Sequence, residues 1–390
     1  MKKYLVLAAA VVMQSALGGI YAWSAFVPPL RERYGLTTGQ TQLVFGVALA
    51  LFILAMVFAG RWQTTRGPRL VATVGGILFG GGYLLASFSG GRLWGLVLGI
   101  GVVSGAGIGF AYVCPIATCI RWFPARKGLV TGVAVAGFGG GAVLLSSVAA
   151  ALFARGWDPL AVFRLVGLTY GPAIVLAALA MFVPGACPRP AGAAAPPKGI
   201  TVRALVRDRR FWLLFAAMFA GTFAGLMTIG NLKPIGLAAG AAPALATAAI
   251  SALAVGNAAG RLGWGWLADR LGWRTIPLSL AFLAAAVALL IPLARVGPAF
   301  LGVAAAVGFG FGACLVLYAA AAAHYFGADE VGRTYPLISL SYGLSGTVGP
   351  VAAGWIFDAS ATYVPALALA AALAAAGAAL VLALGRRVLA

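Results

Sequence analysis

Long apolar runs recur from one end of this 390-residue sequence to the other, and they limit the folds open to the chain. A helix needs about 20 apolar residues to cross a bilayer. The runs do not alternate apolar and polar residues as barrel strands would, so helices are expected. We interpret them as spans over residues 4–30, 40–62, 70–89, 93–121, 127–154, 162–184, 210–237, 242–267, 275–293, 297–325, 331–357 and 362–385.

The composition supports an all-α, multi-pass membrane protein. The chain is 63% hydrophobic and 9% charged, against about 25% charged in average soluble proteins. The first 19 residues resemble a signal peptide, but the apolar stretch continues to Leu30, which is too long for one and indicates a first transmembrane helix.

The net charge of +20 reflects membrane topology rather than a nucleic-acid partner. With both termini in the cytoplasm, loops and helix ends place 19 of the 27 cations inside and six outside, which is the positive-inside bias. We therefore expect a multi-pass protein of the inner (plasma) membrane whose lasting partner is the lipid bilayer. The six outside cations are Arg31, Arg33, Arg92, Arg155, Arg164 and Arg295.

The chain shows no pattern for metal, cofactor or catalytic chemistry. Its four cysteines form no CxxC pair, and there is one histidine and no nucleotide-binding loop. A sensor would need a soluble output domain, for which the largest loop is too short. We expect no cofactor, no metal and no enzymatic activity.

A polar stretch over 183–210 separates six spans from six, and landmarks repeat on its two sides. Gly60 and Gly265, which begin "GRWQTTRGPR" and "GWLADRLGWR", are 205 residues apart, and Gly128 and Gly332 are 204 apart. The constant offset is typical of transporters built from a repeated bundle. The predicted domains are a six-helix bundle at 1–184, a cytoplasmic linker at 185–209 and a second six-helix bundle at 210–390.

Arg261 lies among small residues inside the predicted span 242–267, where a charge is costly. Snorkelling to the inner surface is one reading. However, Gly256, Ala259 and Gly260 around it indicate a face packed against other helices, and Asn257 lies one turn earlier on the same face. No Asp or Glu falls within the predicted spans, so we expect Arg261 to bind an anionic substrate. Its planar guanidinium matches a carboxylate bidentately.

Two other titratable groups lie near predicted span ends. For Lys233, close to the outer surface, snorkelling is favoured. His324 ends the span 297–325 near the inner surface; it is either an interfacial histidine or a proton relay, and it is the proton-coupling candidate.

Several motifs resemble those of the oxalate/formate antiporter and monocarboxylate transporter group of the major facilitator superfamily. They are "GGIYAWSAF", "RWFPARKGLVTGVAVAGFGGG", "GNAAGRLGWGWLADRLG" and "GRTYPLISLSYGLSGTVGP". The resemblance implies twelve transmembrane helices in two six-helix bundles with pseudo-two-fold symmetry, and a functional monomer. It also implies that Arg261 binds the substrate carboxylate.

The loop "GWLADRLGWR" is similar to the cytoplasmic signature G-x-x-x-D-R-x-G-x-R of that superfamily. The resemblance implies a gating latch. Asp269 could cap a nearby helix or pair with a cation, and the two arginines face the anionic inner leaflet. The first-half copy has Thr64 and Thr65 in place of Asp and Arg, which predicts a weaker latch there. The gating residues of the complete copy are Gly265, Asp269, Arg270 and Arg274.

Two departures from the family pattern bear on the substrate and its coupling. Tyr342 stands where dicarboxylate carriers would add a second cation, and one arginine neutralises one carboxylate, so a monocarboxylate of the lactate, pyruvate or acetate type is favoured. Asn257 stands where related lactate carriers have an aspartate. Hydroxyl donors for the rest of the anion are expected among Tyr21, Tyr112, Tyr318, Tyr335 and Tyr342.

The sequence thus predicts a secondary active transporter of small monocarboxylates that works by alternating access. Coupling to a co-transported proton is favoured, through His324 or the substrate itself, and organic anion exchange of the oxalate/formate type is the alternative. A carrier of an unrelated solute would show a different set of buried charges.

Overall fold

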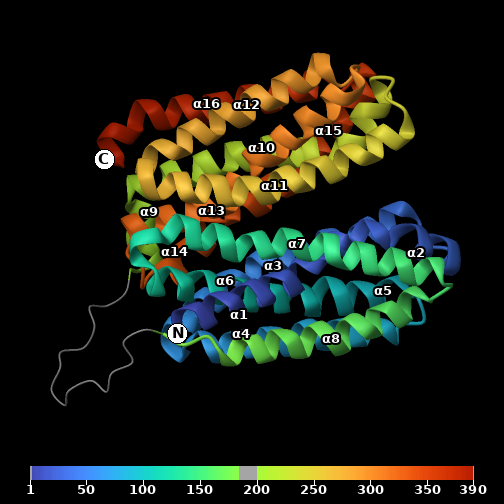
Figure 1. Ribbon diagram of the computed structural model, residues 1–390, viewed down its shortest axis with the longest axis horizontal. Helices are drawn as coiled ribbons and strands as arrows, with labels where there is room; N and C mark the ends of the chain where they lie inside the picture. Colours follow the sequence, from blue (N-terminus) through green and yellow to red (C-terminus); the bar gives the residue numbers. More distant parts are fainter. Residues whose placement is uncertain (1, 184–199, 390) are drawn as a thin grey trace. The chain divides into compact units, whose positions relative to one another are not determined.

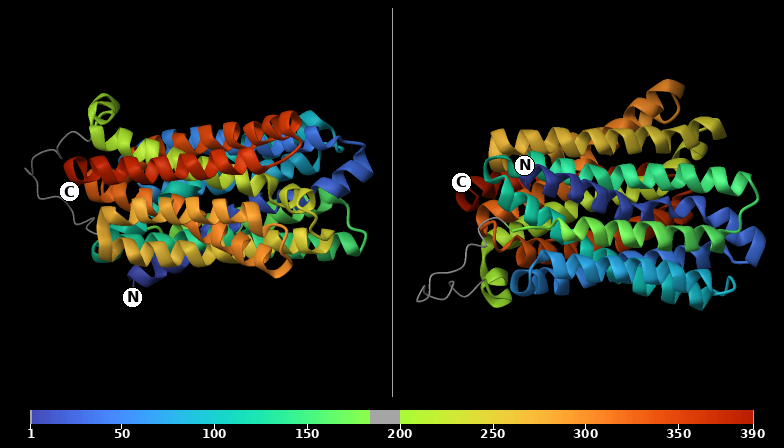
Figure 2. Two further views of the ribbon diagram at one scale, coloured as in Figure 1. Left: turned by 90° about the horizontal axis from the view of Figure 1, so that it is seen from above. Right: turned by 60° about the horizontal axis from the view of Figure 1, so that its bottom comes forward.

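The computed structural model describes residues 2–183 and 200–389, and within those ranges every regular element is helical. The predicted linker residues 185–199 lie outside the described ranges. Figure 1 shows the helices, and Figure 2 shows them from two further sides. Up to residue 179 they are α1 (Lys2–Gly18), η1 (Gly19–Ala25), α2 (Val27–Tyr34), α3 (Thr38–Arg66), α4 (Pro68–Ser87), α5 (Leu93–Leu96), η2 (Val97–Ser104), α6 (Gly105–Trp122), η3 (Pro124–Arg126), α7 (Lys127–Ala154) and α8 (Pro159–Leu179).

The second part of the chain is helical in the same way. Its elements are α9 (Val202–Arg207), α10 (Arg209–Ala238), α11 (Pro243–Leu271), η4 (Gly272–Arg274), α12 (Thr275–Leu293), α13 (Gly297–Tyr325), α14 (Val331–Ile338), α15 (Leu340–Ser360) and α16 (Val364–Val388).

Ten segments of the described chain are long and apolar enough to cross a membrane. One of them, Ala244–Leu293, contains both α11 and α12 and therefore covers two predicted spans. The predicted span 331–357 is helical as α14 and α15 but is not among the ten. The first predicted span is shorter than expected: the apolar segment ends at Trp23, and α2 is a separate short helix.

The helices form two compact units. The first comprises Met1–Pro124, Val133–Gly199 and Phe326–Leu337, and the second comprises Ala125–Gly132, Ile200–Tyr325 and Ile338–Ala390. The start of α7 therefore counts with the second unit and most of α14 with the first. Each compact unit thus includes a short segment from the other predicted bundle, so the predicted bounds of the two bundles stay a prediction.

In the first unit, the glycines at four-residue spacing in α6 let that helix approach α3. A Cβ added to Gly105 would lie 2.7 Å from the carbonyl oxygen of Ala48, and one added to Gly109 would meet the carbonyl of Phe52. Small residues at this spacing allow backbones to pack directly, which is the main route to helix association in lipid. The glycine pattern therefore has the packing role that its spacing indicates.

The π-helix η2, just before α6, lies at a close approach to α4. A Cβ on Gly99 would lie 2.6 Å from the carbonyl oxygen of Gly82, and the buried Ser104 hydroxyl donates to the carbonyl of Phe79 at 2.7 Å. Short π-helical turns occur where the regular i to i−4 ladder is disturbed. The side-chain bond to Phe79 ties this irregular turn to its neighbour.

In the second unit, α11 and α13 pack backbone to backbone (Figure 1). A Cβ on Gly256 would meet the carbonyl of Ala305, one on Gly260 that of Phe309, and one on Gly308 that of Leu253. These glycines come from both helices, so the contact is reciprocal. It fixes the stretch of α11 that carries Asn257 and Arg261.

We predict that Gly308→Ala lowers the unfolding free energy in detergent, by about 1–3 kcal/mol, because the added methyl group must displace backbone. The measurement is thermal unfolding of the purified chain. Gly302→Ala in the same helix is the matched control, since nothing lies within 4 Å of a Cβ there. That control should be neutral or slightly stabilising because alanine favours helix by about 1 kcal/mol. Equal unfolding temperatures for the two variants would contradict the packing argument.

Candidate functional site

Arg261 is buried in the second unit. It is 5% exposed, and Asn257, one turn earlier in α11, is 9% exposed. Among the side chains that the structure describes, Arg261 is the only buried charged one. A snorkelling arginine would extend to the surface, so this burial favours the reading in which Arg261 lies on a packed face.

The backbone around Arg261 is held by two glycines. A Cβ on Gly312 of α13 would lie 2.8 Å from the Arg261 nitrogen and 2.6 Å from the Asn257 carbonyl oxygen, and one on Gly132 of α7 would meet the Arg261 carbonyl. The guanidinium therefore projects from a rigid part of the helix. Asn257 Oδ1 is buried and accepts no hydrogen bond from the described residues, so it is open to a donor.

Tyr318 and Tyr342 belong to the same unit as Arg261. Tyr318 lies in α13, which packs on α11, and is 1% exposed; Tyr342 lies in α15, is 4% exposed and faces the ring of Phe311 at 6.5 Å. Sequence reasoning missed a further hydroxyl pair in this unit: buried Ser345 donates to Thr222 at 2.6 Å, between α15 and α10.

Tyr21 and Tyr112 come together in the first unit around one ring. Phe138 of α7 lies 5.4 Å from the ring of Tyr21 and 5.2 Å from that of Tyr112, both edge-on. The fully buried Gln14 of α1 donates to the Tyr112 carbonyl at 3.2 Å, and its Oε1 accepts no hydrogen bond from the described residues. Sequence reasoning missed Gln14, although a lone amide in an apolar span is a signal.

The remaining site candidates lie in different surroundings. Tyr335 of α14 is fully buried and belongs to the first unit. His324 is exposed near the end of α13, with its ring 4.8 Å from that of Tyr325. Lys233, in α10, is exposed.

Two helices extend past their predicted spans and take in an acidic residue. Helix α15 continues to Ser360 and includes Asp358. Helix α11 likewise continues to Leu271 and includes Asp269. Both lie within three residues of a helix end, because each helix is longer than its apolar run.

Asp269 caps the start of α7. Its Oδ1 accepts from the Gly128 nitrogen at 2.7 Å and its Oδ2 from the Leu129 nitrogen at 2.8 Å. A carboxylate at a helix N-terminus satisfies free N–H groups and interacts favourably with the helix dipole. Of the two expected roles, capping is the one observed. Gly265 makes the approach possible, since a Cβ there would meet the Gly128 carbonyl.

The two arginines of the same loop are exposed. The Arg270 guanidinium lies over the ring of Trp266, 3.8 Å from its centroid, and Arg274 ends the turn η4. Neither contributes to the cap, so the contact with α7 rests on Asp269 and Gly265.

The first-half copy of this contact lies in the first unit and is built differently. Gly60 meets the backbone of Gly332 as Gly265 meets that of Gly128, and the pairs are related by the offset seen in the sequence. Thr64, at the position of Asp269, accepts from Arg333 Nε at 3.0 Å. A neutral hydroxyl thus replaces the carboxylate, as the sequence comparison of the halves predicts.

A polar cluster links α2 to the start of α8 in the first unit. Asp158 accepts from the Leu160 nitrogen at 2.7 Å and from the Tyr34 hydroxyl, and it pairs with Arg33 at 2.7 Å. Burial, and then the hydrogen bond to the Asp158 carboxylate, raise the pKa of Tyr34 to about 12. The phenol therefore stays neutral at any physiological pH.

The fold and these contacts define an all-helical membrane protein of a known class. The model of the Major Facilitator Superfamily matches residues 7–272 and again 222–388. The chain belongs to the major facilitator superfamily. A solved structure, that of the MFS transporter FucP in the outward conformation, superposes with a TM-score of 0.74 over 97% of this chain and 98% of that one, at 14% identity.

Curated relatives confirm the resemblance to the oxalate/formate antiporter and monocarboxylate transporter group. The chain is 28% identical to the oxalate:formate antiporter of Oxalobacter formigenes, covering 85% of this chain and 79% of that one. It is 27% identical to monocarboxylate transporter 11 of Homo sapiens, covering 86% and 73%. The protein is thus a multi-pass membrane transporter of this superfamily, and not an enzyme.

We predict that Asp269→Ala lowers the unfolding free energy by about 0.5–2 kcal/mol, the usual loss for a helix N-cap. Thr64→Ala is the matched control at the corresponding position of the first half. We expect a smaller loss because its hydroxyl is neutral: it accepts one hydrogen bond, from Arg333, and donates one to the Arg61 carbonyl within its own helix. Thermal unfolding in detergent measures both. A Thr64→Ala loss as large as that of Asp269→Ala would show that the carboxylate adds nothing.

Proposed function

We propose that this chain is a secondary active transporter of small monocarboxylates, of the lactate, pyruvate or acetate type, in which Arg261 binds the substrate carboxylate. The observation that carries the proposal is the burial of this one arginine at a glycine-packed position of α11. A buried ion is retained in a membrane segment at high free-energy cost, which favours a binding role. The relatives named for oxalate, formate and monocarboxylates support the same substrate class.

The number of buried cations supports a monoanion. Arg261 is the only buried charged side chain described, and the position expected for a second cation holds Tyr342. A dianion would leave one charge uncompensated in a low-dielectric site, which is strongly unfavourable. Asn257, with its buried Oδ1, lies one turn from Arg261 and is suited to accept a hydrogen bond from a hydroxyl on the substrate.

Hydroxyl groups of five tyrosines, four of them buried and Tyr21 partly buried, are proposed as further substrate donors. Tyr318 and Tyr342 share the unit of Arg261, and Tyr21, Tyr112 and Tyr335 belong to the other. A phenol hydroxyl binds a carboxylate oxygen without adding charge. It therefore adjusts orientation and size selection while Arg261 supplies the charge.

The Asp269 cap is proposed as the gating latch of the transport cycle. Its two short bonds to the start of α7 are charge-assisted and are therefore stronger than neutral ones. Any motion that separates α11 from that turn has to break both. With both termini in the cytoplasm, as the distribution of cations predicts, this latch lies on the cytoplasmic side.

Coupling to a proton is proposed through His324 or through the substrate itself. The chain has one histidine, and imidazole is the side chain whose charge changes between pH 5 and 8. Exchange of organic anions is the alternative, which the similarity to the oxalate:formate antiporter favours.

We expect Arg261→Ala to lower uptake of radiolabelled L-lactate into proteoliposomes by at least about 30-fold, because truncating one partner of a buried charge pair costs 2–5 kcal/mol. Arg261→Lys should retain part of the uptake, since it keeps the charge but loses the fork. Lys233→Ala, an exposed cation of the same unit, is the matched control and should transport as wild type. Unchanged uptake by a folded Arg261→Ala protein would contradict the proposal that Arg261 binds the substrate carboxylate.

A second experiment separates proton coupling from exchange. Lactate uptake is measured with and without an inward proton gradient, and with empty or lactate-loaded proteoliposomes. Proton coupling predicts stimulation by the gradient with empty vesicles, and His324→Gln should lower that stimulation. Uptake that needs internal anion and ignores the gradient would instead establish exchange.

A further inference from the structure

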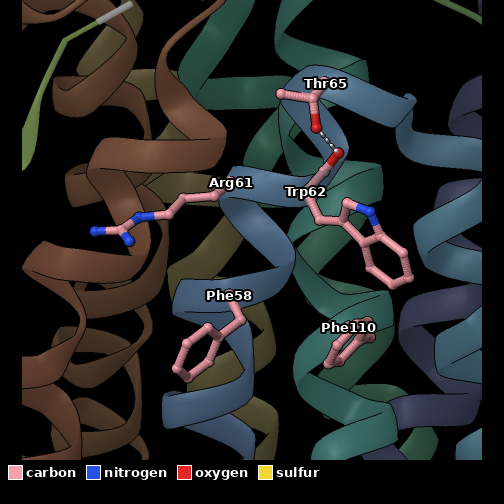
Figure 3. A pocket seen from close by; sticks show the side chains of 5 residues that line it. All are labelled: Phe58, Arg61, Trp62, Thr65 and Phe110. Atoms are coloured by element: carbon pink, nitrogen blue, oxygen red, sulfur yellow. Dashed lines mark hydrogen bonds between the residues drawn. The ribbon is translucent and has the colours of Figure 1, made fainter.

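A groove on the first unit runs between α3 and α6, and it carries one charged side chain. Its volume is about 390 Å³, and it is lined by Phe58, Arg61, Trp62, Thr65 and Phe110. Figure 3 shows Thr65 near the end of α3, then Arg61 and Trp62 with their side chains on opposite sides of the helix, then Phe58 on the side of Arg61, with Phe110 on the neighbouring α6. Apart from Arg61 and Thr65, the lining is aromatic.

The side chains that line the groove differ between its two ends, which lie at different depths in the candidate membrane span Leu43–Arg66. Phe58 is 66% exposed, and its ring is two turns from the span end. Trp62 follows one turn later and meets the ring of Phe110 edge-on at 5.8 Å. Tryptophan is enriched where hydrocarbon meets the head groups. The Phe58 end therefore suits acyl chain and the Trp62 end suits the boundary with the head groups.

Arg61 adds a positive charge at that boundary. It lies five residues before the span end, or about 7.5 Å along the helix axis. The side chain is exposed and forms no ion pair with any residue that the structure describes. The hydroxyls of Thr64 and Thr65 donate to the backbone carbonyl oxygens of Arg61 and Trp62, at 2.8 and 3.0 Å, and so do not bind the guanidinium.

We propose that this groove binds a phospholipid with an anionic head group, whose phosphate contacts the Arg61 guanidinium and whose acyl chain lies along Phe58 and Phe110. The guanidinium fork matches a phosphate bidentately. A zwitterionic lipid also has a phosphate, but its cationic group opposes the approach of Arg61. The groove contributes no carboxylate to compete for the arginine. Charge complementarity therefore selects the anionic lipid.

None of the groove residues belongs to the proposed substrate site or to the Asp269 latch, but Arg61, Trp62 and Thr65 lie in the first-half copy of the latch loop. Arg61 directly follows Gly60, whose backbone lies against that of Gly332.

The test measures lipid binding to the full chain. Delipidated protein in nonionic detergent is titrated with phosphatidylglycerol or phosphatidylcholine, and the first dissociation constant is read by native mass spectrometry. We expect Arg61→Gln to weaken phosphatidylglycerol binding about fivefold, because that is what one cation near an anionic membrane surface contributes to affinity. Arg61→Lys should retain most of the affinity. Arg66→Gln, in the same helix but outside the groove, is the matched control and should bind as wild type.

A second readout locates the lipid. In proteoliposomes, phosphatidylglycerol with brominated acyl chains should quench Trp62 more than brominated phosphatidylcholine does, with Trp62→Phe giving the Trp62 contribution by difference. Equal quenching by the two lipids, or the same phosphatidylglycerol affinity in Arg61→Gln and wild type, would overturn the proposal.

Discussion

Direct contact between helix backbones is the constraint on which this structure depends. Lipid tails are as apolar as leucine, so burial of apolar side chains does little to hold one membrane helix against another. Here glycines replace that driving force with close packing: α6 meets α3 at Gly105 and Gly109, and α11 meets α13 at Gly256, Gly260 and Gly308. The helices are fixed where their backbones touch, and the functional side chains project from those fixed stretches.

The buried arginine follows from the same constraint. The backbone of Arg261 is in close contact with Gly132 and Gly312, and the preceding residue, Gly260, lies against the backbone of Phe309. The helix around Arg261 therefore cannot shift to let the side chain reach the surface. Its guanidinium is thereby held inside the unit, where a charge is costly and a bound carboxylate would offset that cost. Packing and charge thus act together, since small neighbours keep the arginine where a substrate anion is needed.

The sequence predicted much of this. Span bounds agree closely where apolar runs and helices coincide, as for α7 and α13, and the burial of Arg261 follows from small neighbours visible in the sequence. For Asp269 the sequence left two roles open, a helix cap or an ion pair, because the partner at the start of α7 is distant in the chain. It did not predict α2 as a separate helix, the π-helix η2 or the reach of α15 to Asp358, because these depend on local backbone geometry rather than hydropathy. Gln14 was missed although a lone amide in an apolar span stands out, and the Thr222–Ser345 pair was missed because a small hydroxyl residue has no periodic signal until its partner on another helix is known.

The glycine contacts also bear on how such a sequence can change over time. This chain is rich in both alanine and glycine, and a single nucleotide substitution converts a glycine codon to an alanine codon. At Gly302 that replacement meets open space, whereas at Gly260 or Gly141 it would drive a methyl group into a neighbouring backbone. Two residues that differ by one carbon atom are thus interchangeable at some positions and incompatible at others. Whether a glycine-to-alanine substitution in the spans is tolerated therefore depends on the separation of the helix axes, much more than on hydrophobicity.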